Sequence, residues 1–247
     1  MTTQQMLSYL RKGITKYKLI SDGDKIAVGV SGGKDSVTLL KLLAEYKRFS
    51  PERFDLIAIT VDLNFSGTPV DYTPIKELCQ SLNVEYYIEK TDIGKIVFDV
   101  RKESNPCALC SKMRKGALNT LAKNLWCNKV ALGHHADDLT DTLLLSLFYE
   151  GRLSTFAPKS YLDKIGLTLI RPMIMTKEID VVGYAKTLPV IKSCCPANKL
   201  TKREYVKDII KNISKDIPNV RDMIFTALIH PERYNLFDRF ESEIDKF

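Results

Sequence analysis

Short apolar runs alternate with longer segments of helical spacing along the first 150 residues of the chain. The runs have the length of buried strands and lie at 25–30, 55–61, 85–89 and 129–133. The helical segments that follow them lie at 35–46, 75–82, 112–126 and 137–149. Short strands that alternate with helices predict an α/β fold with a doubly wound, mostly parallel sheet. Ligands of such sheets bind beyond the carboxyl ends of the strands.

The two ends of the chain have a different pattern. Residues 1–20 place apolar side chains at helical spacing, and residues 202–247 are charged and helical in character. Between them, 151–170 reads as a loop with a hairpin. We therefore expect an N-terminal helix at 1–22, a nucleotide-binding catalytic domain at 23–200, and a small helical C-terminal appendage at 201–247.

Composition adds two expectations. Charged residues make up 27% of the 247 residues, and no apolar run approaches the ~20 residues that would cross a bilayer. The polar start of the chain has no apolar signal core, so we expect a cytoplasmic protein without a membrane partner. The formal charge of +7 favours a polyanionic partner such as RNA, although a merely basic soluble protein would have it too.

A glycine pair between the first strand and the first following helix carries the clearest chemistry. The segment is Ser31-Gly32-Gly33-Lys34-Asp35-Ser36. Glycines let the backbone approach a phosphate closely, and the helix N-terminus directs N–H groups at the anion. The spacing differs from that of a Walker A loop. The alternative is a serine–glycine turn that caps a helix.

Polar residues also follow two other strands. Asp62 ends the second strand, where it could contact a nucleotide or a metal ion. Gly133 ends the fourth strand and His134 follows it, and we expect both at the nucleotide site. Asp137 is expected to cap the next helix, whereas a carboxylate at Asp138 could act as a base or hold magnesium.

The cysteines fall into two groups. Cys79 and Cys127 lie in apolar surroundings and are expected in the core. The remaining four, Cys107, Cys110, Cys194 and Cys195, form a CxxC pair and a distant adjacent pair. Two thiolates spaced as CxxC can bind a metal or cluster, and a third would leave one cluster iron without a protein ligand. A redox CxxC, a structural zinc site and chance are the alternatives.

The SGGxDS pattern at Ser31 to Ser36 resembles the signature of the PP-loop ATP pyrophosphatase superfamily. The resemblance implies cleavage of ATP between its α- and β-phosphates, with an adenylated intermediate and pyrophosphate as products. It also implies that Asp35 helps to hold magnesium or the phosphates.

Further segments resemble the tRNA 2-thiocytidine synthetase family in their order and approximate spacing. They are PCALCSKMRKG, KVALGHHADD, IRPM, LPVIKSCC and RYNLFDRF, and the resemblance runs from Asp24 to the C-terminus. It implies ATP, Mg²⁺ and a [4Fe-4S] cluster held by three cysteines. Its implied reaction activates the carbonyl of cytidine 32 in the anticodon loop of tRNA and replaces the oxygen with sulfur.

Matching residues give the implied roles. Cys107 and Cys110 correspond to the family's CxxC ligands, and Cys194 is the preferred third ligand, with Cys195 second. The family usually has a second CxxC where this chain has adjacent cysteines. Arg114 corresponds to a basic position that could neutralise developing charge, and Asp138 to a position implicated in catalysis.

The resemblance also implies a sulfur donor, either a cysteine desulfurase or inorganic sulfide, and a homodimer. Three other functions remain open from the sequence. They are a cluster-free ligase such as tRNA lysidine synthetase, a zinc-containing RNA-binding protein, and a cluster-dependent sulfurtransferase that acts on uridine or another substrate.

Overall fold

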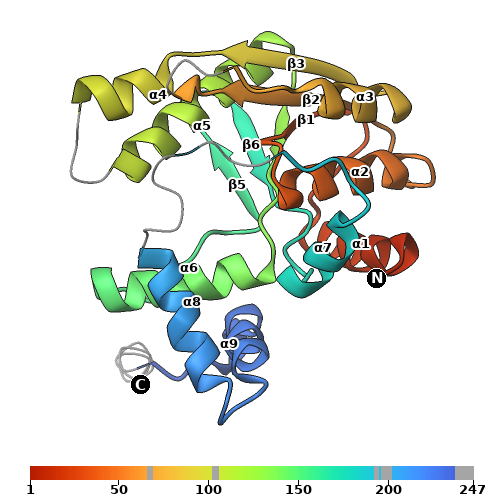
Figure 1. The fold of residues 1–247 in the computed structure, drawn as a ribbon. Helices are drawn as coiled ribbons and strands as arrows, with labels where there is room; N and C mark the ends of the chain where they lie inside the picture. The colour runs from red at the N-terminus through yellow and green to blue at the C-terminus, as the bar shows by residue number, and fades with distance from the viewer. Residues whose placement is uncertain (66–68, 102–105, 192–194, 196–201, 237–247) are drawn as a thin grey trace, which may run out of the picture. The chain divides into compact units, whose positions relative to one another are not determined.

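The computed structural model describes residues 1–65, 69–101, 106–191, 195 and 202–236 (Figure 1). The chain forms two compact units. Unit 1 comprises residues 1–138 and 156–201, and unit 2 comprises residues 139–155 and 202–247. The domain boundaries expected from the sequence stay a prediction.

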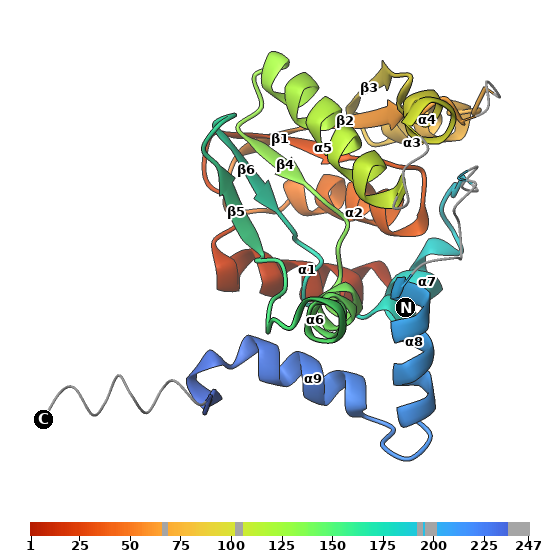
Figure 2. The ribbon, with the colours of Figure 1, turned by 90° about the vertical axis from the view of Figure 1, so that its left-hand side faces the viewer.

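A six-stranded sheet forms the centre of unit 1. Its strands are β1 (Asp24–Gly29), β2 (Phe54–Asp62), β3 (Glu85–Lys90), β4 (Lys129–Ala131), β5 (Lys159–Leu162) and β6 (Leu167–Ile170). They lie in the order β3-β2-β1-β4-β6-β5, and β5 is the antiparallel member (Figure 2). The predicted α/β fold with a parallel-dominated sheet is confirmed. Strand order reverses between β1 and β4, which is where such sheets bind ligands.

Four helices belong to the larger apolar core on one face of the sheet. They are α1 (Thr3–Tyr17), α2 (Lys34–Lys47), α3 (Thr73–Ser81) and α7 (Glu178–Ala185). In α1, Met6, Leu10 and Ile14 are fully buried at the spacing that the sequence predicts, and a capping box between Thr2 and Gln5 fixes the start of the helix.

The other face of the sheet packs against α5 (Pro106–Asn124). Leu118 and Ala122 of α5 join Ile57, Val130 and Leu169 in a second core. The short helix α4 (Ile93–Lys95) and the π-helix η2 (Ile96–Arg101) precede α5. The helix expected at 112–126 therefore begins six residues earlier, at a proline suited to a helix start, so that the CxxC pair lies inside it.

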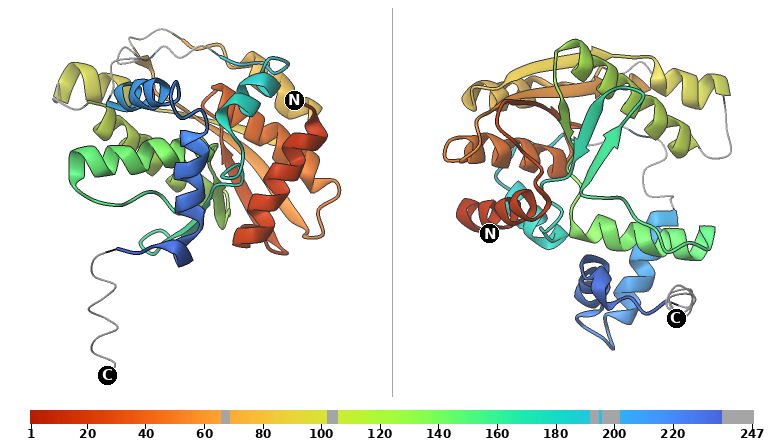
Figure 3. Two further views of the ribbon diagram at one scale, coloured as in Figure 1. Left: turned by 90° about the horizontal axis from the view of Figure 1, so that it is seen from below. Right: turned by 180° about the vertical axis from the view of Figure 1, so that it is seen from behind.

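The expected hairpin is formed by β5 and β6 at the end of the sheet (Figure 3, right). Its second strand pairs in parallel with β4 and so extends the main sheet. The sequence predicted the hairpin but not this pairing, because four-residue strands carry little periodicity of their own.

Unit 2 consists mainly of helices. Helix α6 (Ala136–Glu150) begins in unit 1 and continues into unit 2, which also contains α8 (Lys202–Ile213), α9 (Val220–Ile229) and the 3₁₀ turn η3 (Pro231–Arg233). The fully buried Asp141 of α6 accepts a 2.8 Å hydrogen bond from Arg221 of α9. Within the described part of the chain, we find no helix with both the length and the apolar character that a bilayer span requires.

Candidate active site at the carboxyl edge of the sheet

The loop between β1 and α2 is folded around two serines and two glycines. The Ser36 hydroxyl accepts a hydrogen bond from the Ser31 amide at 3.1 Å and donates one to the Gly33 carbonyl at 2.9 Å. Gly32 has a φ of +81°, a conformation that favours glycine. Gly33 occupies the N-cap of α2 and offers no capping side chain, which leaves the start of the helix suited to an external anion.

A distant segment reaches this loop. The Ile191 amide donates a 2.9 Å hydrogen bond to the Gly32 carbonyl. A Cβ at Gly32 would lie 3.1 Å from the Cβ of Ile191, so the two backbones approach closely. Ile191, four positions before Cys195 in the sequence, therefore lies directly beside the phosphate loop.

Lys34 takes part in an ion-pair network at the start of α2. Its Nζ lies 2.9 Å from the Asp35 carboxylate and 3.1 Å from that of Glu178. Burial acts to lower the pKa of Lys34, but the hydrogen bonds and charges of Asp35 and Glu178 outweigh it, and the pKa is raised. Lys34 therefore keeps its positive charge beside the loop. The sequence did not indicate Glu178, which lies 144 positions away.

A buried histidine connects two of the predicted carboxylates. His135 Nε2 lies 3.5 Å from Asp138 and 3.7 Å from Asp35, and its Nδ1 lies 3.9 Å from Asp137. The side chain of His135 is 3% exposed. The structure thus brings Asp35 and Asp138, from different elements, to one imidazole nitrogen. Of the adjacent pair, His134 was the predicted site residue, and the sequence pattern did not indicate His135.

Asp137 and Asp138 each accept a hydrogen bond from a backbone amide at the N-terminus of a helix. The Asp137 carboxylate accepts a 2.6 Å hydrogen bond from the Glu178 amide at the beginning of α7. The Asp138 carboxylate accepts one of 3.1 Å from the His135 amide, which is half of a capping box for α6. The prediction that Asp137 caps the helix that follows it therefore needs correction. Asp137 caps α7, and Asp138 accepts the capping hydrogen bond at the start of α6. The catalytic role of Asp138 stays a prediction.

Gly133 packs directly on the phosphate loop. A Cβ at this position would lie 2.9 Å from the backbone carbonyl of Asp35 and 3.1 Å from the Ser36 amide. The next residue, His134, packs against Phe156 with the two rings tilted by 41° and their centroids 4.8 Å apart. The buried Arg171 guanidinium lies 4.8 Å from the same Phe156 ring. The expected contact of His134 with a nucleotide stays a prediction.

Asp62 closes β2 at the same edge of the sheet. Its carboxylate accepts hydrogen bonds from the Asn64 amide at 3.1 Å and the Tyr72 hydroxyl at 3.4 Å. Nearby, the Tyr86 hydroxyl donates to Thr60 Oγ1 at 2.9 Å, and Thr60 donates to the Val30 carbonyl at 2.7 Å. This chain of hydrogen bonds fixes the residue that precedes the phosphate loop, and the sequence did not single out Tyr86.

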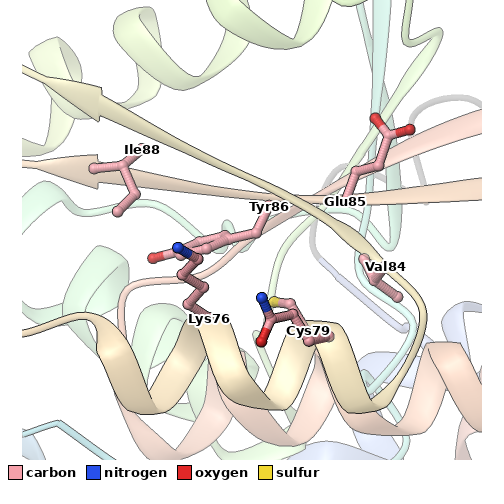
Figure 4. Close-up of a pocket in the computed structure, with 7 residues that line it drawn as sticks. Lys76, Cys79, Val84, Glu85, Tyr86 and Ile88 are labelled. Carbon is pink, nitrogen blue, oxygen red and sulfur yellow. The ribbon is translucent and has the colours of Figure 1, made fainter.

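A cavity of about 480 Å³ lies between α3 and β3, away from the predicted site residues. Its lining includes Lys76, Cys79, Val84, Glu85, Tyr86 and Ile88 (Figure 4). Burial raises the pKa of Cys79 to about 11. Cys79 and Cys127 are both buried in the core, as the sequence predicts.

The CxxC pair occupies the first turns of α5. Cys107 is exposed and Cys110 is half-buried. Burial raises the pKa of Cys110; Arg114 acts to lower it, whereas Cys195 and Cys107 act to raise it further. Cys110 of α5 and Cys195 thus interact electrostatically.

Thiolates are the donors that iron–sulfur clusters require, so this set fits such a group in its chemistry. Cys194 lies outside the described residues. Among the residues that are described, no three His, Cys, Asp or Glu side chains already converge on a metal position. Arg114 lies one helical turn beyond Cys110, and its expected role at a phosphate stays a prediction.

Comparison with known families agrees with this geometry. Residues 3–212 match the family model described as a PP-loop domain. The chain belongs to the PP-loop family.

Its curated relatives cover nearly the whole chain. A protein of Citrifermentans bemidjiense named tRNA-cytidine(32) 2-sulfurtransferase is 36% identical over 233 residues, which cover 92% of this chain and 91% of the relative. A protein of the same name from Syntrophotalea carbinolica is 39% identical over 232 residues, with 92% and 89% covered. The resemblance to the 2-thiocytidine synthetases is therefore confirmed.

A solved structure is also similar. The U34-tRNA thiolase NcsA from Methanococcus maripaludis, determined with its [4Fe-4S] cluster, aligns with a TM-score of 0.74 and 26% identity. The alignment covers 94% of this chain and 79% of the thiolase.

Proposed function

We propose that this PP-loop protein thiolates tRNA in an ATP-dependent reaction that exchanges the C2 oxygen of cytidine 32 for sulfur. One observation carries the proposal beyond the names of the relatives. The segment of Ile191 binds the phosphate loop at Gly32, and Cys195 from the same segment interacts with Cys110. An ATP-activated atom and the thiols would thus be close enough for one substrate to meet both.

The phosphate loop would hold ATP through its backbone amides and the hydroxyls of Ser31 and Ser36. Lys34 adds a positive charge, and binding of phosphates would compete with its present partners Asp35 and Glu178. Asp35 and Asp138 carry carboxylate oxygens, which are suited to bind Mg²⁺. Once Asp35 binds the metal ion, Lys34 would be available to bind the phosphates. Gly133 allows the chain after β4 to pack directly on the backbone of Asp35 and Ser36.

The cytidine oxygen would attack the α-phosphorus and expel pyrophosphate, which makes the oxygen a leaving group. Asp138 would orient or deprotonate the reacting groups, and Arg114 would neutralise the charge that develops. Sulfur would then replace the activated oxygen, and AMP would leave. The exchange of oxygen for sulfide requires no net oxidation or reduction.

Cys107, Cys110 and either Cys194 or Cys195 would hold a [4Fe-4S] cluster. Such a cluster supplies an iron position that can bind a sulfur atom. The electrostatic interaction of Cys195 with Cys110 supports Cys195, while the family pattern favours Cys194. Inorganic sulfide would supply the sulfur directly, or a cysteine desulfurase would supply it as a persulfide that a thiol reductant brings to the sulfide level with two electrons. We place the reaction in the cytoplasm and in a homodimer.

The test uses anaerobically reconstituted protein with ATP, Mg²⁺, sulfide and an unmodified tRNA transcript. Mass spectrometry of the digested nucleosides should detect 2-thiocytidine, and a transcript with uridine at position 32 should not react. If no thionucleoside forms although iron and ATP are bound, the proposed function is wrong.

The cluster ligands can be tested separately by iron content and visible absorption. Cys107→Ser and Cys110→Ser should lose the absorption, whereas Cys127→Ala, a buried thiol away from the pair, should keep it. Comparing Cys194→Ser with Cys195→Ser identifies the third ligand. A colourless, fully active wild-type protein would favour a cluster-free ligase instead.

A second candidate is thiolation of uridine. The observation in its favour is the structural similarity to the U34-tRNA thiolase, which extends over 94% of this chain. The nucleoside analysis decides between the two, because a 2-thiouridine product would replace 2-thiocytidine.

A further inference from the structure

A groove of about 580 Å³ runs between helix α5 and the β5–β6 hairpin in unit 1. It is lined by side chains from both elements, among them Lys112, Lys115 and Gly116 of α5 and Tyr161 and Lys164 of the hairpin. None of these residues belongs to the nucleotide site described above. The groove therefore requires its own explanation.

The α5 side of the groove has small and cationic residues. Its lining includes Ala108, Ser111, Lys112, Lys115 and Gly116, which recur at helical spacing along one face. Both lysines are exposed, and a side chain at Gly116 would meet nothing within 4 Å. The apolar residues of α5 lie on the face that packs against the sheet. The face that lines the groove is different. That face is open to a ligand and is not needed for the core.

The groove starts at the predicted cluster site. Ala108 lies between the two cysteines of the CxxC pair, and Ser111 follows the second one directly. A ligand lying in the groove would therefore reach the first turns of α5, which also carry the CxxC pair.

The hairpin side adds an aromatic ring and more positive charge. Tyr161 is 63% exposed although it lies in a strand. A Cβ at Gly166 would lie 3.4 Å from Lys123 Nζ and 3.8 Å from the Tyr161 hydroxyl, so Lys123 borders the same turn. Asp163 is the acidic residue of the lining, against Lys112, Lys115 and Lys164.

We propose that this groove binds the phosphodiester backbone of the RNA substrate along α5, the helix whose first turns carry the CxxC pair. Lysine ammonium groups spaced along a helix match phosphates spaced along a strand. An exposed tyrosine between them is a surface on which an unpaired base stacks. The inference rests on the proposed function, since it names the surface that holds the tRNA in that reaction.

The test measures tRNA binding rather than thiolation. The variant carries Lys112→Ala, Lys115→Ala and Lys164→Ala, and the matched control carries Lys12→Ala, Lys16→Ala and Lys186→Ala. The control residues are equally exposed and belong to α1 and to the end of α7, which pack on the other face of the sheet. Fluorescence anisotropy of labelled tRNA gives the dissociation constant over a range of salt concentrations.

Loss of three phosphate contacts should weaken binding about tenfold or more and make the slope of log K against log salt shallower by about 2 to 3. Tyr161→Ala should weaken binding roughly fivefold or more without changing the slope, and Tyr161→Phe should bind like the wild type. In the control triple variant, the change in the slope of log K against log salt should be less than a third of the change in the groove variant.

Three results would overturn the inference. The first is wild-type affinity and slope in the groove variant with ATP binding and iron content retained. The second is equal loss in the control, which would indicate a general effect of net charge. The third is normal tRNA binding with lost sulfur transfer from a cysteine desulfurase, which would assign the groove to a protein donor. If the wild type itself neither binds nor thiolates tRNA, the proposed function fails instead.

Discussion

Two adjacent carboxylates in the site, Asp137 and Asp138, differ in their hydrogen-bond partners. Asp138 lies 3.5 Å from His135 Nε2 and accepts the amide of the same residue, whereas Asp137 caps α7 through the Glu178 amide. An asparagine at position 138 keeps an oxygen acceptor for that amide but loses the negative charge. This separation of charge from capping allows the two roles to be tested independently.

We expect Asp138→Asn to lower the single-turnover thiolation rate at least about 100-fold, the usual range for loss of a general base or metal ligand. Its thermal unfolding should stay close to that of the wild type. Asp137→Ala should instead destabilise the protein by about 1 kcal/mol through loss of the α7 cap. An Asp138→Asn enzyme within a fewfold of the wild-type rate would remove this carboxylate from the mechanism.

The thiols differ in reactivity because they differ in burial. Burial raises the pKa of both Cys79 and Cys127 to about 11, while Cys107 is exposed. The neutral thiol is the favoured form of the buried pair, so their protection should hold below about pH 9 and be lost as the pH rises toward about 11.

Iodoacetamide at pH 7.5 should therefore alkylate Cys107 in cluster-free protein and leave Cys79 and Cys127 unmodified. Peptide mapping by mass spectrometry measures the modification at each site. Equal labelling of Cys79 and Cys107 in folded protein would contradict the burial that the structure assigns to them.

The contact between the end of β4 and the start of α2 depends on one glycine. Since a Cβ at Gly133 would lie 2.9 Å from the Asp35 backbone, alanine there must displace the first turn of α2. Gly133→Ala should cost about 1–3 kcal/mol of unfolding free energy and weaken ATP binding. Gly183→Ala in α7 is the matched control, because nothing lies within 4 Å of its Cβ and helix propensity should make it neutral or stabilising. Denaturant unfolding and ATP titration of both variants check the expectation.

Most of the architecture could be predicted because the buried strands are continuous apolar runs. The loop after β1 could also be predicted from a local pattern. A glycine pair between a strand and a helix allows the tight turn and close phosphate approach that such a loop needs. The hairpin's place in the sheet could not be predicted. Pairing of β6 with β4 depends on register between segments 39 residues apart at Lys129 and Thr168, which no local pattern encodes.

The site was predicted less completely than the fold. Ser31 to Ser36 and the CxxC pair are local motifs, but His135 and Glu178 acquire their roles from tertiary contacts. Of two adjacent histidines, the sequence cannot tell which side chain turns toward Asp35. Asp137 illustrates the same limit, because its hydrogen-bond partner lies 41 positions away.

Unit 2 contains a buried charge that the proposed chemistry does not use. Burial raises the pKa of Asp141, and Arg221, Arg203 and Lys207 oppose the rise. Asp141 is fully buried, and Arg221 donates the 2.8 Å hydrogen bond that connects α9 to α6. This ion pair is therefore expected to govern local unfolding of α9 independently of the sheet in unit 1.

Arg221→Ala should destabilise unit 2 by about 1–3 kcal/mol, at the lower end of buried ion pairs because Arg221 is partly exposed. The pKa of Asp141 should rise further in the variant. A raised carboxylate pKa favours the protonated folded form, so the loss of stability should be larger at pH 7 than near pH 4.

Hydrogen exchange should accelerate in α8 and α9 and stay unchanged in β1 and β2. Lys215→Ala, which removes an equal charge from an exposed position of the same unit, should change neither. Uniform acceleration throughout both units would show instead that Asp141 and Arg221 support global rather than local stability.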